Sequence, residues 1–464
     1  MSINVKHLKG PKGYPLVGMT PKLDLNNLHN QLEGWAKEFG DVFNLDLGYT
    51  SQTVVSRPSI IHKIFANRPE GFIRMKKMDG ILKEGGVHGV FNAEGDEWRL
   101  HRKIVAKGLD VKHQKEFYPL MLSTVEKLYN KWAKNAENGD VFDIQRDLLR
   151  FTVDITATLA FGFKMNTLEQ EGSAIQDHME KVFPMIFKRI NQPIQWHRLY
   201  KNRADKEFEV AVEEMKKLVE EFISSGVERL KSNPELKDNP SNLLESILIA
   251  AEEEKDFTLK EVRGTLLTLL MAGEDTTAHT LIWILYLLTM HTDVQKGIRE
   301  EADRILGEDK WLKEYKANNE FHFIEGVAHE SMRFKPVAPL MVFQAAKEMN
   351  IEEFCFKKGQ KIITNYRPGA LNDDYFSDAQ KFNPKRWLKE SKCPVHNMEA
   401  FGAFGGGPRY CPGRNLAILE IKMVIAMLFK NFNVEMVTEH KDIHEIMAFA
   451  MMASDYKVRL TPRG

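Results

Sequence analysis

The sequence predicts a mainly α protein, with a helical body, one long central helix and a small β-rich part. From about Trp98 onward, most segments are rich in Leu, Met, Glu and Lys, which favour helices. Earlier, apolar and polar residues alternate over 43–47, and a glycine and the apolar run "TVV" follow. This alternation is typical of a β-hairpin. We therefore place the small β-rich part at about residues 40–70 and interpret 1–464 as a single domain.

The composition excludes several classes of protein. The chain has 464 residues, of which 43% are hydrophobic and 28% charged, as in ordinary globular proteins. Lys plus Arg (65) equals Asp plus Glu (65), so we expect no nucleic-acid partner. The N-terminal sequence has no apolar run long enough for a signal peptide or a membrane span of ~20 residues. We therefore expect a cytoplasmic protein without a transmembrane segment, and leave open whether an N-terminal anchor was removed.

The central helix is predicted from the segment that follows Thr258. Thr258 and Glu261 have the spacing of a capping box, and the run to about Thr289 is apolar on almost all sides. At 1.5 Å per residue such a helix would span ~45 Å. A buried helix fits this pattern better than a membrane helix, because Glu274 and Asp275 lie side by side in its middle.

The chain has three cysteines, Cys355, Cys393 and Cys411. The odd count and the lack of paired spacing argue against a disulfide scaffold or a zinc site. Cys411 lies in "FGGGPRYCPG", just before a helix that is predicted to start near Gly413. A helix N-terminus favours a thiolate, and glycines allow the backbone to pass close to a flat group.

Such a loop suits haem iron, with Arg409 available to a haem propionate. A buried structural cysteine and a nucleophilic cysteine are the alternatives. A nucleophile would need a histidine base, and none lies near Cys411 in the sequence.

The pattern Phe404-x-x-Gly407-x-Arg409-x-Cys411-x-Gly413 resembles the haem-binding loop of the cytochrome P450 family. The resemblance extends over nearly the whole chain. It implies a cytochrome P450-like fold, bound haem b (iron protoporphyrin IX) and Cys411 as the axial ligand of the haem iron. It also implies that the remaining loop positions line the haem, namely Arg409, Phe404, Gly405 and Gly413.

"AGEDTT" (residues 272–277) resembles the oxygen-activation motif in the long central helix of this family. The resemblance implies that Ala272 leaves room for dioxygen beside the helix. It further implies that Thr276 donates a proton to the bound oxygen and that Asp275 relays protons from water. The alternative is a structural one, in which these polar groups bond to their own helix backbone.

Two further pairs resemble family motifs. Glu330 and Arg333 resemble the Glu-x-x-Arg pair that is joined by a later arginine, here Arg386, and the resemblance makes them structural residues. Trp98 and Arg102 resemble the Trp-x-x-x-Arg of a helix that reaches the haem propionates.

The chain departs from the family pattern in two places. Many relatives carry a propionate-binding arginine near the position of Phe343 and Gln344. Here that propionate is either held differently or bound by another residue. Lys385 stands where an acidic residue is common before the loop arginine.

The resemblance implies a haem-thiolate monooxygenase that inserts one atom of O2 into a lipophilic organic substrate, by hydroxylation or oxidative dealkylation. The chain has no Gly-x-Gly-x-x-Gly after a strand and no iron–sulfur cysteine set, so we expect no fused reductase domain. Electrons from NAD(P)H would then come through a separate redox partner, a ferredoxin or a flavodoxin or reductase. Two alternatives stay open: an enzyme that uses or rearranges peroxides, and a non-catalytic haem sensor or carrier.

The resemblance places five largely apolar segments over the substrate face of the haem, at about 72–91, 182–193, 269–272, 337–343 and 447–452. Two sets of basic residues stand apart from this pattern. The first either binds a substrate carboxylate at the channel mouth or faces water, and consists of Arg74, Lys76, Lys77, Lys188 and Arg189. The second either docks the redox partner or is solvated, and consists of Arg99, Arg102, Lys103, Lys107, Arg414 and Lys422.

Overall fold

The computed structural model describes residues 2–163, 165–169, 174–389 and 396–463. The chain is mainly α, as predicted, and its residues group into two compact units. The first unit comprises Met1–Gly80, His329–Cys411 and Glu445–Met452. The second comprises Ile81–Ala328, Pro412–His444 and Ala453–Gly464.

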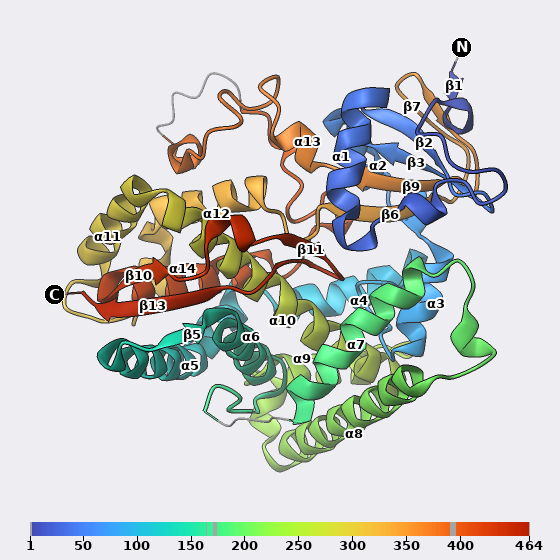
Figure 1. Ribbon diagram of the computed structural model, residues 1–464. Coiled ribbons are helices and arrows are strands. Elements are labelled where there is room, and N and C mark those ends of the chain that lie inside the picture. Colours follow the sequence, from blue (N-terminus) through green and yellow to red (C-terminus); the bar gives the residue numbers. More distant parts are fainter. Residues whose placement is uncertain (1, 164, 170–173, 390–395, 464) are drawn as a thin grey trace. The chain divides into compact units, whose positions relative to one another are not determined.

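The first unit is built on a five-stranded sheet (Figure 1). Its strand order is β2 (Val42–Asp46), β3 (Ser51–Val55), β9 (Lys361–Asn365), β6 (Leu340–Ala345) and β4 (Phe72–Arg74). Strands β2 and β3 pair antiparallel, so the hairpin expected from the alternation over 43–47 is confirmed. The parallel β3–β9 pair joins residues about 300 positions apart, and no local sequence pattern predicts it.

The sheet of the first unit has an apolar layer on each face. Val54 packs with Leu32 of helix α1, whereas the next residue, Val55, belongs to the cluster around Ile64 of helix α2. Successive side chains of a strand point to opposite faces, so β3 can serve both layers. The remaining elements in this part of the chain are α1 (Leu28–Phe39), α2 (Pro58–Ala66), α13 (Arg367–Ala370), β1 (Ile3–Asn4), β7 (Met349–Ile351) and β8 (Phe354–Phe356).

The second unit is helical, with one small sheet of order β10–β13–β5. Its helices are α4 (Gly95–Gly108), α5 (Val111–Asn138), α6 (Ile144–Phe161), α7 (Ala174–Asn191), α8 (Arg203–Ser232), α9 (Leu243–Glu253), α10 (Leu259–Met290), α11 (Thr292–Leu306) and α14 (Arg414–Asn431). The other elements of the chain are α3 (Lys76–Glu84), α12 (His322–Phe334), β5 (Val141–Asp143), β10 (Phe432–Met436), β11 (Glu445–Met447), β12 (Met451–Ala453) and β13 (Lys457–Pro462).

Helix α10 is the central helix that the sequence predicts. The Thr258 side chain and the Glu261 carboxylate form the expected capping box at its start. The helix packs along α6 (Figure 1), and Gly273 makes a close approach possible. A Cβ atom on Gly273 would lie only 2.5 Å from Oγ1 of Thr156 on α6. Any larger residue would push the two helices apart at this point.

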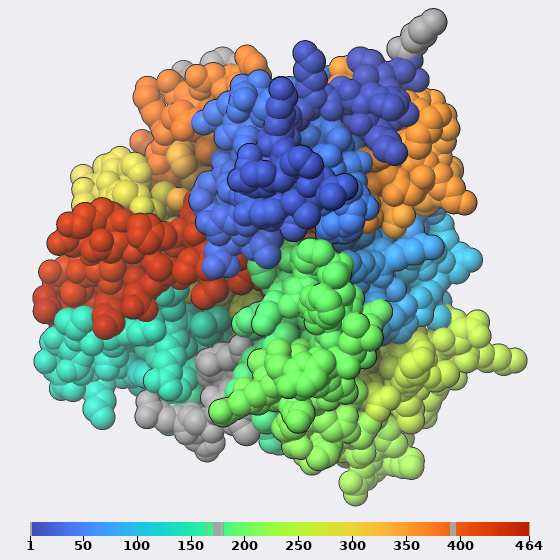
Figure 2. Space-filling model, turned by 45° about the vertical axis from the view of Figure 1, so that its right-hand side comes forward, coloured from blue at the N-terminus to red at the C-terminus, as the bar shows by residue number. Residues whose placement is uncertain are grey.

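Helices α7 and α8 pack against each other. In the space-filling view, the green surface covers the part of the chain that contains them (Figure 2). Among the described residues, no helix has both the length and the apolar character that crossing a bilayer requires.

Candidate active site

The loop that carries Cys411 is closed by a hydrogen bond from the Cys411 amide to the Phe404 carbonyl oxygen, 3.0 Å long. Gly405 and Gly407 have φ values of +69° and +62°, in the left-handed region that glycine tolerates. A Cβ on Gly407 would lie 2.3 Å from the backbone oxygen of Phe65 at the end of α2. The loop is thus pressed against α2 on one side.

Gly405 has open space on its other side. A Cβ atom there would meet only the methyl group of Met341, at 3.8 Å. The Phe404 and Arg409 side chains are half-buried, and so is the Cys411 thiol. Cys411 is followed within three residues by α14, for which Gly413 is the N-terminal capping residue, so the predicted helix start is confirmed.

The other cysteines differ from Cys411. Cys355 is buried in β8, where its thiol contacts the Glu348 carboxylate at 3.7 Å. Cys393 lies outside the described residues. Of the two described thiols, only that of Cys411 is partly accessible.

Helix α10 has an opening in the middle of its otherwise buried length. Ala272 is exposed there, and Asp275 and Thr276 are half-buried. The Thr276 hydroxyl donates a hydrogen bond to the Ala272 carbonyl oxygen at 2.8 Å. This is the local backbone bond of the structural alternative, and it also holds the hydroxyl at the opening beside the exposed Ala272.

Asp275 is paired with a residue that the sequence argument did not single out. His279 lies one turn further along α10, with its Nε2 3.8 Å from Oδ1 of Asp275. Burial raises the pKa of Asp275 to about 7 and lowers the pKa of His279 to about 4. The pair therefore carries a proton on the carboxyl group at slightly acid pH and loses it near neutrality. The i,i+4 spacing could have identified His279 from the sequence.

Trp98 and Arg102 lie on α4, four residues apart as predicted. Trp98 is buried and Arg102 is half-buried. Their side chains are one turn apart and therefore on the same face of the helix.

Glu330 on α12 is the centre of a buried network in the first unit. Arg333 donates two hydrogen bonds to its carboxylate, of 2.8 and 2.9 Å, and Arg386 donates a third of 3.1 Å. Two further donors were missed by sequence reasoning, the Trp387 indole at 2.8 Å and the Asn383 amide at 2.8 Å. Burial alone would raise the pKa of Glu330, but the hydrogen bonds and charges of the arginines hold it below its usual value.

Arg333 extends this network to the last residue of α13, Ala370, and into the irregular segment that follows it. Its guanidinium donates to the carbonyl oxygens of Ala370 and Ala379, at 2.6 and 2.8 Å. The network therefore fixes backbone that has no regular secondary structure.

Comparison with known proteins identifies the family. The family model described as "Cytochrome P450" matches residues 8–460, nearly the whole chain. The chain belongs to the cytochrome P450 family. It is thus an oxidoreductase of the haem-thiolate monooxygenase type, and haem is the cofactor that this family implies.

The curated relatives of this cytochrome P450 are distant. It is 27% identical to the "Bifunctional cytochrome P450/NADPH--P450 reductase 2" of Bacillus subtilis, over 98% of this chain but only 42% of that protein. It is 25% identical to "Cytochrome P450 704B1" of Arabidopsis thaliana, over 99% of this chain and 96% of that protein. It is 24% identical to "Tabersonine 16-hydroxylase 1" of Catharanthus roseus, over 98% of this chain and 90% of that protein.

The residues present fit a haem. The Cys411 loop offers a thiol, a cation two residues away and a glycine with open space beside it. A cytochrome P450 needs this donor set, because a thiolate binds the iron and cations balance the propionates.

Two basic residues of the cytochrome P450 were assigned wrongly from the sequence. Arg189 neither faces water nor lies at a channel mouth, because it is buried, bonds to Asp205 at 2.8 Å and stacks over the Phe208 ring. Lys422 is not part of an exposed docking face, because it is buried and pairs with Glu325 at 2.5 Å.

The rest of the proposed docking face is partly neutralised. Arg99 pairs with Asp96 and Lys103 pairs with Glu254, each at 2.5 Å. These pairs reduce the positive charge that a redox partner would meet.

Two aromatic residues in the predicted substrate segments belong to a core instead. Phe72 and Phe343 are fully buried in the apolar layer on the α2 side of the sheet. Their strand positions alone could not show which face of the sheet they occupy.

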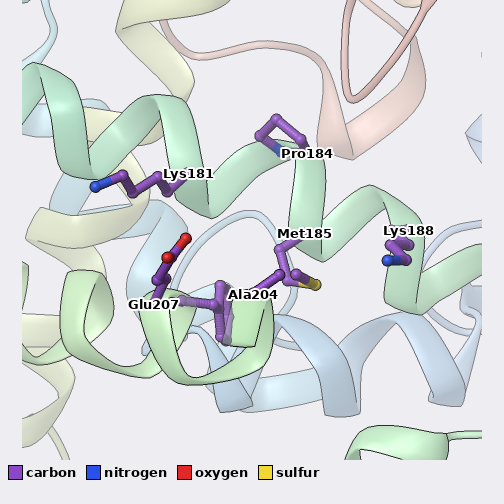
Figure 3. A pocket seen from close by; sticks show the side chains of 7 residues that line it. Lys181, Pro184, Met185, Lys188, Ala204 and Glu207 are labelled. Carbon is purple, nitrogen blue, oxygen red and sulfur yellow. The ribbon is translucent and has the colours of Figure 1, made fainter. Parts of the chain in front are cut away.

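A small hollow of about 190 Å³ lies between α7 and α8 (Figure 3). Its lining consists of Lys181, Pro184, Met185, Lys188, Ala204, Glu207 and Phe208. Its volume is below the ~300–1,000 Å³ of typical ligand pockets, and it includes none of the predicted catalytic residues.

Proposed function

We propose that this cytochrome P450 oxidises a lipophilic organic substrate, with Cys411 as the axial thiolate ligand and with Asp275 and Thr276 as the proton-delivering residues. The observation that carries the proposal is that Asp275, whose pKa is raised, lies on the same largely buried helix as the exposed residue Ala272 and close to it in the sequence. Haem, when bound, supplies the activation of dioxygen and the oxidation of the substrate. The chain supplies the ligand, the protons and the pocket.

Asp275 and Thr276 divide the proton transfer. A carboxyl group with a pKa of about 7 can take a proton from water and release it at neutral pH with little cost in either direction. The Thr276 hydroxyl, one residue away, can donate a hydrogen bond into the opening beside Ala272. It does so by turning away from the Ala272 carbonyl oxygen.

The remaining contacts position the cofactor. Arg409, Trp98 and Arg102 are proposed to bind propionates, and Phe404, Gly405 and Gly413 to line the haem near Cys411. The two cations, Arg409 and Arg102, have half-buried side chains, and Gly405 has open space beside it.

We further propose Arg68 as the substitute for the missing propionate arginine. Arg68 is buried, and its guanidinium lies 4.5 Å from the centre of the Phe343 ring. Phe343 stands in the stretch where many relatives carry the arginine, so the guanidinium of Arg68 occupies the neighbouring space. The Arg68→Ala variant is expected to release haem more readily than the wild-type protein. Arg57→Ala is the control, because the Arg57 guanidinium pairs with Asp41 nearer the surface, and it should hold haem more firmly than Arg68→Ala.

We also propose the class of the substrate and of the electron donor. Apart from the core residue Phe72, the segments 72–91 and 182–193 carry buried Met, Ile and Phe side chains, which favour an apolar substrate. With Arg189 withdrawn into an ion pair, Arg74, Lys76, Lys77 and Lys188 are the remaining candidates for a carboxylate-binding group. We propose that a separate ferredoxin, flavodoxin or reductase delivers NAD(P)H-derived electrons.

The decisive experiment is the spectrum of the reduced carbon monoxide complex. The wild-type protein and Cys355→Ser are expected to show the red-shifted Soret band of thiolate ligation, and Cys411→Ser is expected to lose it. A retained band in Cys411→Ser would overturn the assignment. A spin-state titration with long-chain acids, their methyl esters and sugars then tests whether the substrate pocket is apolar. This part of the proposal is wrong if only the sugars shift the spin state.

A further inference from the structure

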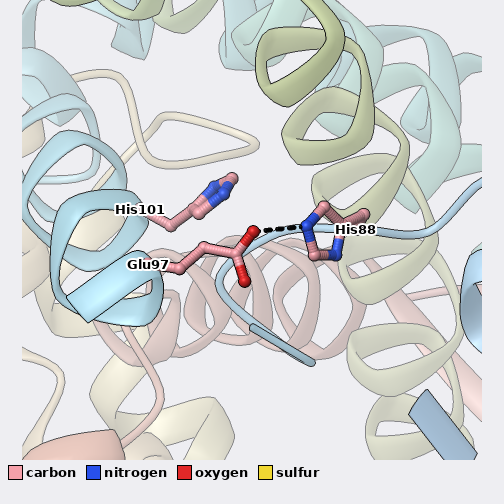
Figure 4. Close-up of side chains that lie close together, drawn as sticks. All are labelled: His88, Glu97 and His101. Carbon is pink, nitrogen blue, oxygen red and sulfur yellow. Dashed lines mark hydrogen bonds and ion pairs between the residues drawn. The ribbon is translucent and has the colours of Figure 1, made fainter. Parts of the chain in front are cut away.

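Three side chains of the second unit form a cluster with the composition of a metal site (Figure 4). Glu97 and His101 lie four residues apart on one face of α4, and His88 belongs to the loop that precedes this helix. One potential ligand atom from each residue lies within 4.8 Å of the other two. His88 Nε2 lies 2.6 Å from the Glu97 carboxylate, and the two imidazole rings are 6.0 Å apart, edge to face.

The two histidines have ring nitrogens that the described part of the chain does not satisfy. His101 is fully buried, and its Nδ1 lies 2.8 Å from the Thr265 hydroxyl, whereas its Nε2 has no hydrogen-bond partner among the described residues. The Nδ1 of His88 is likewise buried without a partner there. Buried polar atoms are nearly always bonded, so an ion is a physical reason for the Nε2 of His101. In His88 the nitrogen that faces the cluster is Nε2, beside Glu97, and Nδ1 lies on the other side of the ring (Figure 4).

The backbone around His88 is held tightly against α10. A Cβ atom on Gly264 of α10 would lie 2.2 Å from the His88 carbonyl oxygen. The loop is also closed internally, since the buried Asn92 side chain accepts from the Gly89 amide and donates to the Val87 carbonyl oxygen. Ligands on rigid backbone suit a metal site, because little ordering is needed when the ion binds.

We propose that a divalent transition-metal ion of the zinc class binds to His88, Glu97 and His101. Two imidazole nitrogens and one carboxylate oxygen are a common zinc ligand set, with water in the fourth position. Magnesium and calcium, by contrast, favour oxygen ligands alone. These three residues are separate from those proposed to contact the haem.

The geometry needs only a modest adjustment. Ligand atoms ~2.0–2.1 Å from a tetrahedral zinc ion lie about 3.4 Å apart. The largest separation of 4.8 Å must therefore shrink by about 1.4 Å. Glu97 can provide part of this movement, because its side chain is exposed. The same exposure gives the ion a path from solvent.

The surroundings of His101 favour binding. Neutral imidazole is the form that binds metal ions. With Nε2 on the metal, Nδ1 carries the hydrogen and donates it to the Thr265 hydroxyl, as outer-sphere partners of zinc-binding histidines do. The bound ion would join α4, the preceding loop and, through Thr265, α10.

The test is zinc binding to the haem-loaded protein. After treatment with EDTA and dialysis, titration calorimetry and elemental analysis are expected to find one zinc ion per chain. Glu97→Gln and His88→Ala are each expected to weaken this binding by at least about tenfold. His62→Ala is the matched control, because His62 lies 3.9 Å from Glu399 without a second imidazole. It is expected to leave the affinity unchanged.

A second measurement separates metal binding from a structural ion pair. Zinc is expected to raise the melting temperature of the wild-type protein and of His62→Ala, but not that of Glu97→Gln or His88→Ala, with the haem spectrum as a check on folding. The proposal is overturned if the wild-type protein binds no stoichiometric zinc. It is equally overturned if both ligand variants bind zinc as the wild type does.

Discussion

Two carboxylates, the buried Glu330 of the first unit and the half-buried Asp275 of the second, have opposite shifts in pKa. Glu330 accepts five hydrogen bonds, three of them from arginines. Within the described residues, no hydrogen bond to the Asp275 carboxylate is found, and the imidazole of His279 lies 3.8 Å away. The pKa of Glu330 is lowered and that of Asp275 is raised to about 7.

The difference follows from how the buried charge is compensated. A fully bonded carboxylate is a fixed anion that organises structure and does not exchange protons near neutrality. A poorly bonded one keeps its proton up to about pH 7 and can exchange it with water, which is a property of functional sites. The comparison predicts that substitutions at Glu330 act on folding and that those at Asp275 act on chemistry.

The largest effect is expected from Glu330→Gln. The change leaves Arg333 and Arg386 buried without their counter-ion, and breaking a buried pair costs about 3–5 kcal/mol of unfolding free energy. Urea unfolding of the haem-loaded protein measures it.

The matched control for Glu330→Gln is Glu214→Gln. Glu214 and Lys217 have the same i,i+3 spacing and the same 2.8 Å distance as Glu330 and Arg333, but they lie on the surface. Stability is expected to match that of the wild type in this variant. Equal losses in the two variants would refute the importance of burial.

Asp275→Asn is expected to change the pH dependence of stability. The carboxyl group of the unfolded chain loses its proton near the ordinary aspartate pKa of 3.8, whereas that of the folded protein keeps it to about 7. The contribution of Asp275 to the free energy of unfolding is therefore full below about pH 4 and is lost as the pH rises through 7. Relative to Asp275→Asn, the wild type should lose up to roughly 4 kcal/mol over this range. Parallel stability curves from pH 4 to 8 would contradict the raised pKa.

The same variant is expected to slow turnover by roughly 100-fold or more, because an amide cannot relay protons. Product formation from any compound that shifts the haem spin state measures the effect. The control is Asp293→Asn at the start of α11 in the same unit, where turnover should not change.

Thr276→Ala is expected to change the rate of NAD(P)H oxidation less than the fraction of reducing equivalents that reaches the product. Reducing equivalents should be diverted to hydrogen peroxide, because the hydroxyl no longer directs a proton to bound oxygen. Loss of the bond to the Ala272 carbonyl should change the unfolding free energy by only about 1 kcal/mol. Unchanged coupling of NAD(P)H use to product would indicate that Thr276 serves only its own helix.

His279→Gln is expected to have the smallest effect. His279 is neutral at pH 7, since burial lowers its pKa to about 4, so the substitution removes no positive charge from the side of Asp275. The pH–rate profile should therefore move by less than about half a pH unit. A large shift of the profile would mean instead that Asp275 and His279 form an ion pair. The Asp275 carboxylate would then be compensated by a positive charge, as the Glu330 carboxylate is.

Local patterns determined much of the fold. The β2–β3 hairpin follows from alternation, α10 from its capping box and apolar run, and α14 from the helix start near Gly413. These elements depend on residues that are close in the sequence, and short-range backbone and side-chain preferences are sufficient to specify them.

The sequence by itself determined the chemical residue types of this protein: the thiol of Cys411, the carboxyl and hydroxyl groups of Asp275 and Thr276, and the Glu330–Arg333 spacing. Only the tertiary structure decided their environments. It joined β3 to β9, withdrew Arg189 and Lys422 into buried ion pairs, and brought His88 beside Glu97 and His101. The physical reason is that burial and counter-charges set the pKa and accessibility of a polar group. Both depend on side chains that are distant in the sequence.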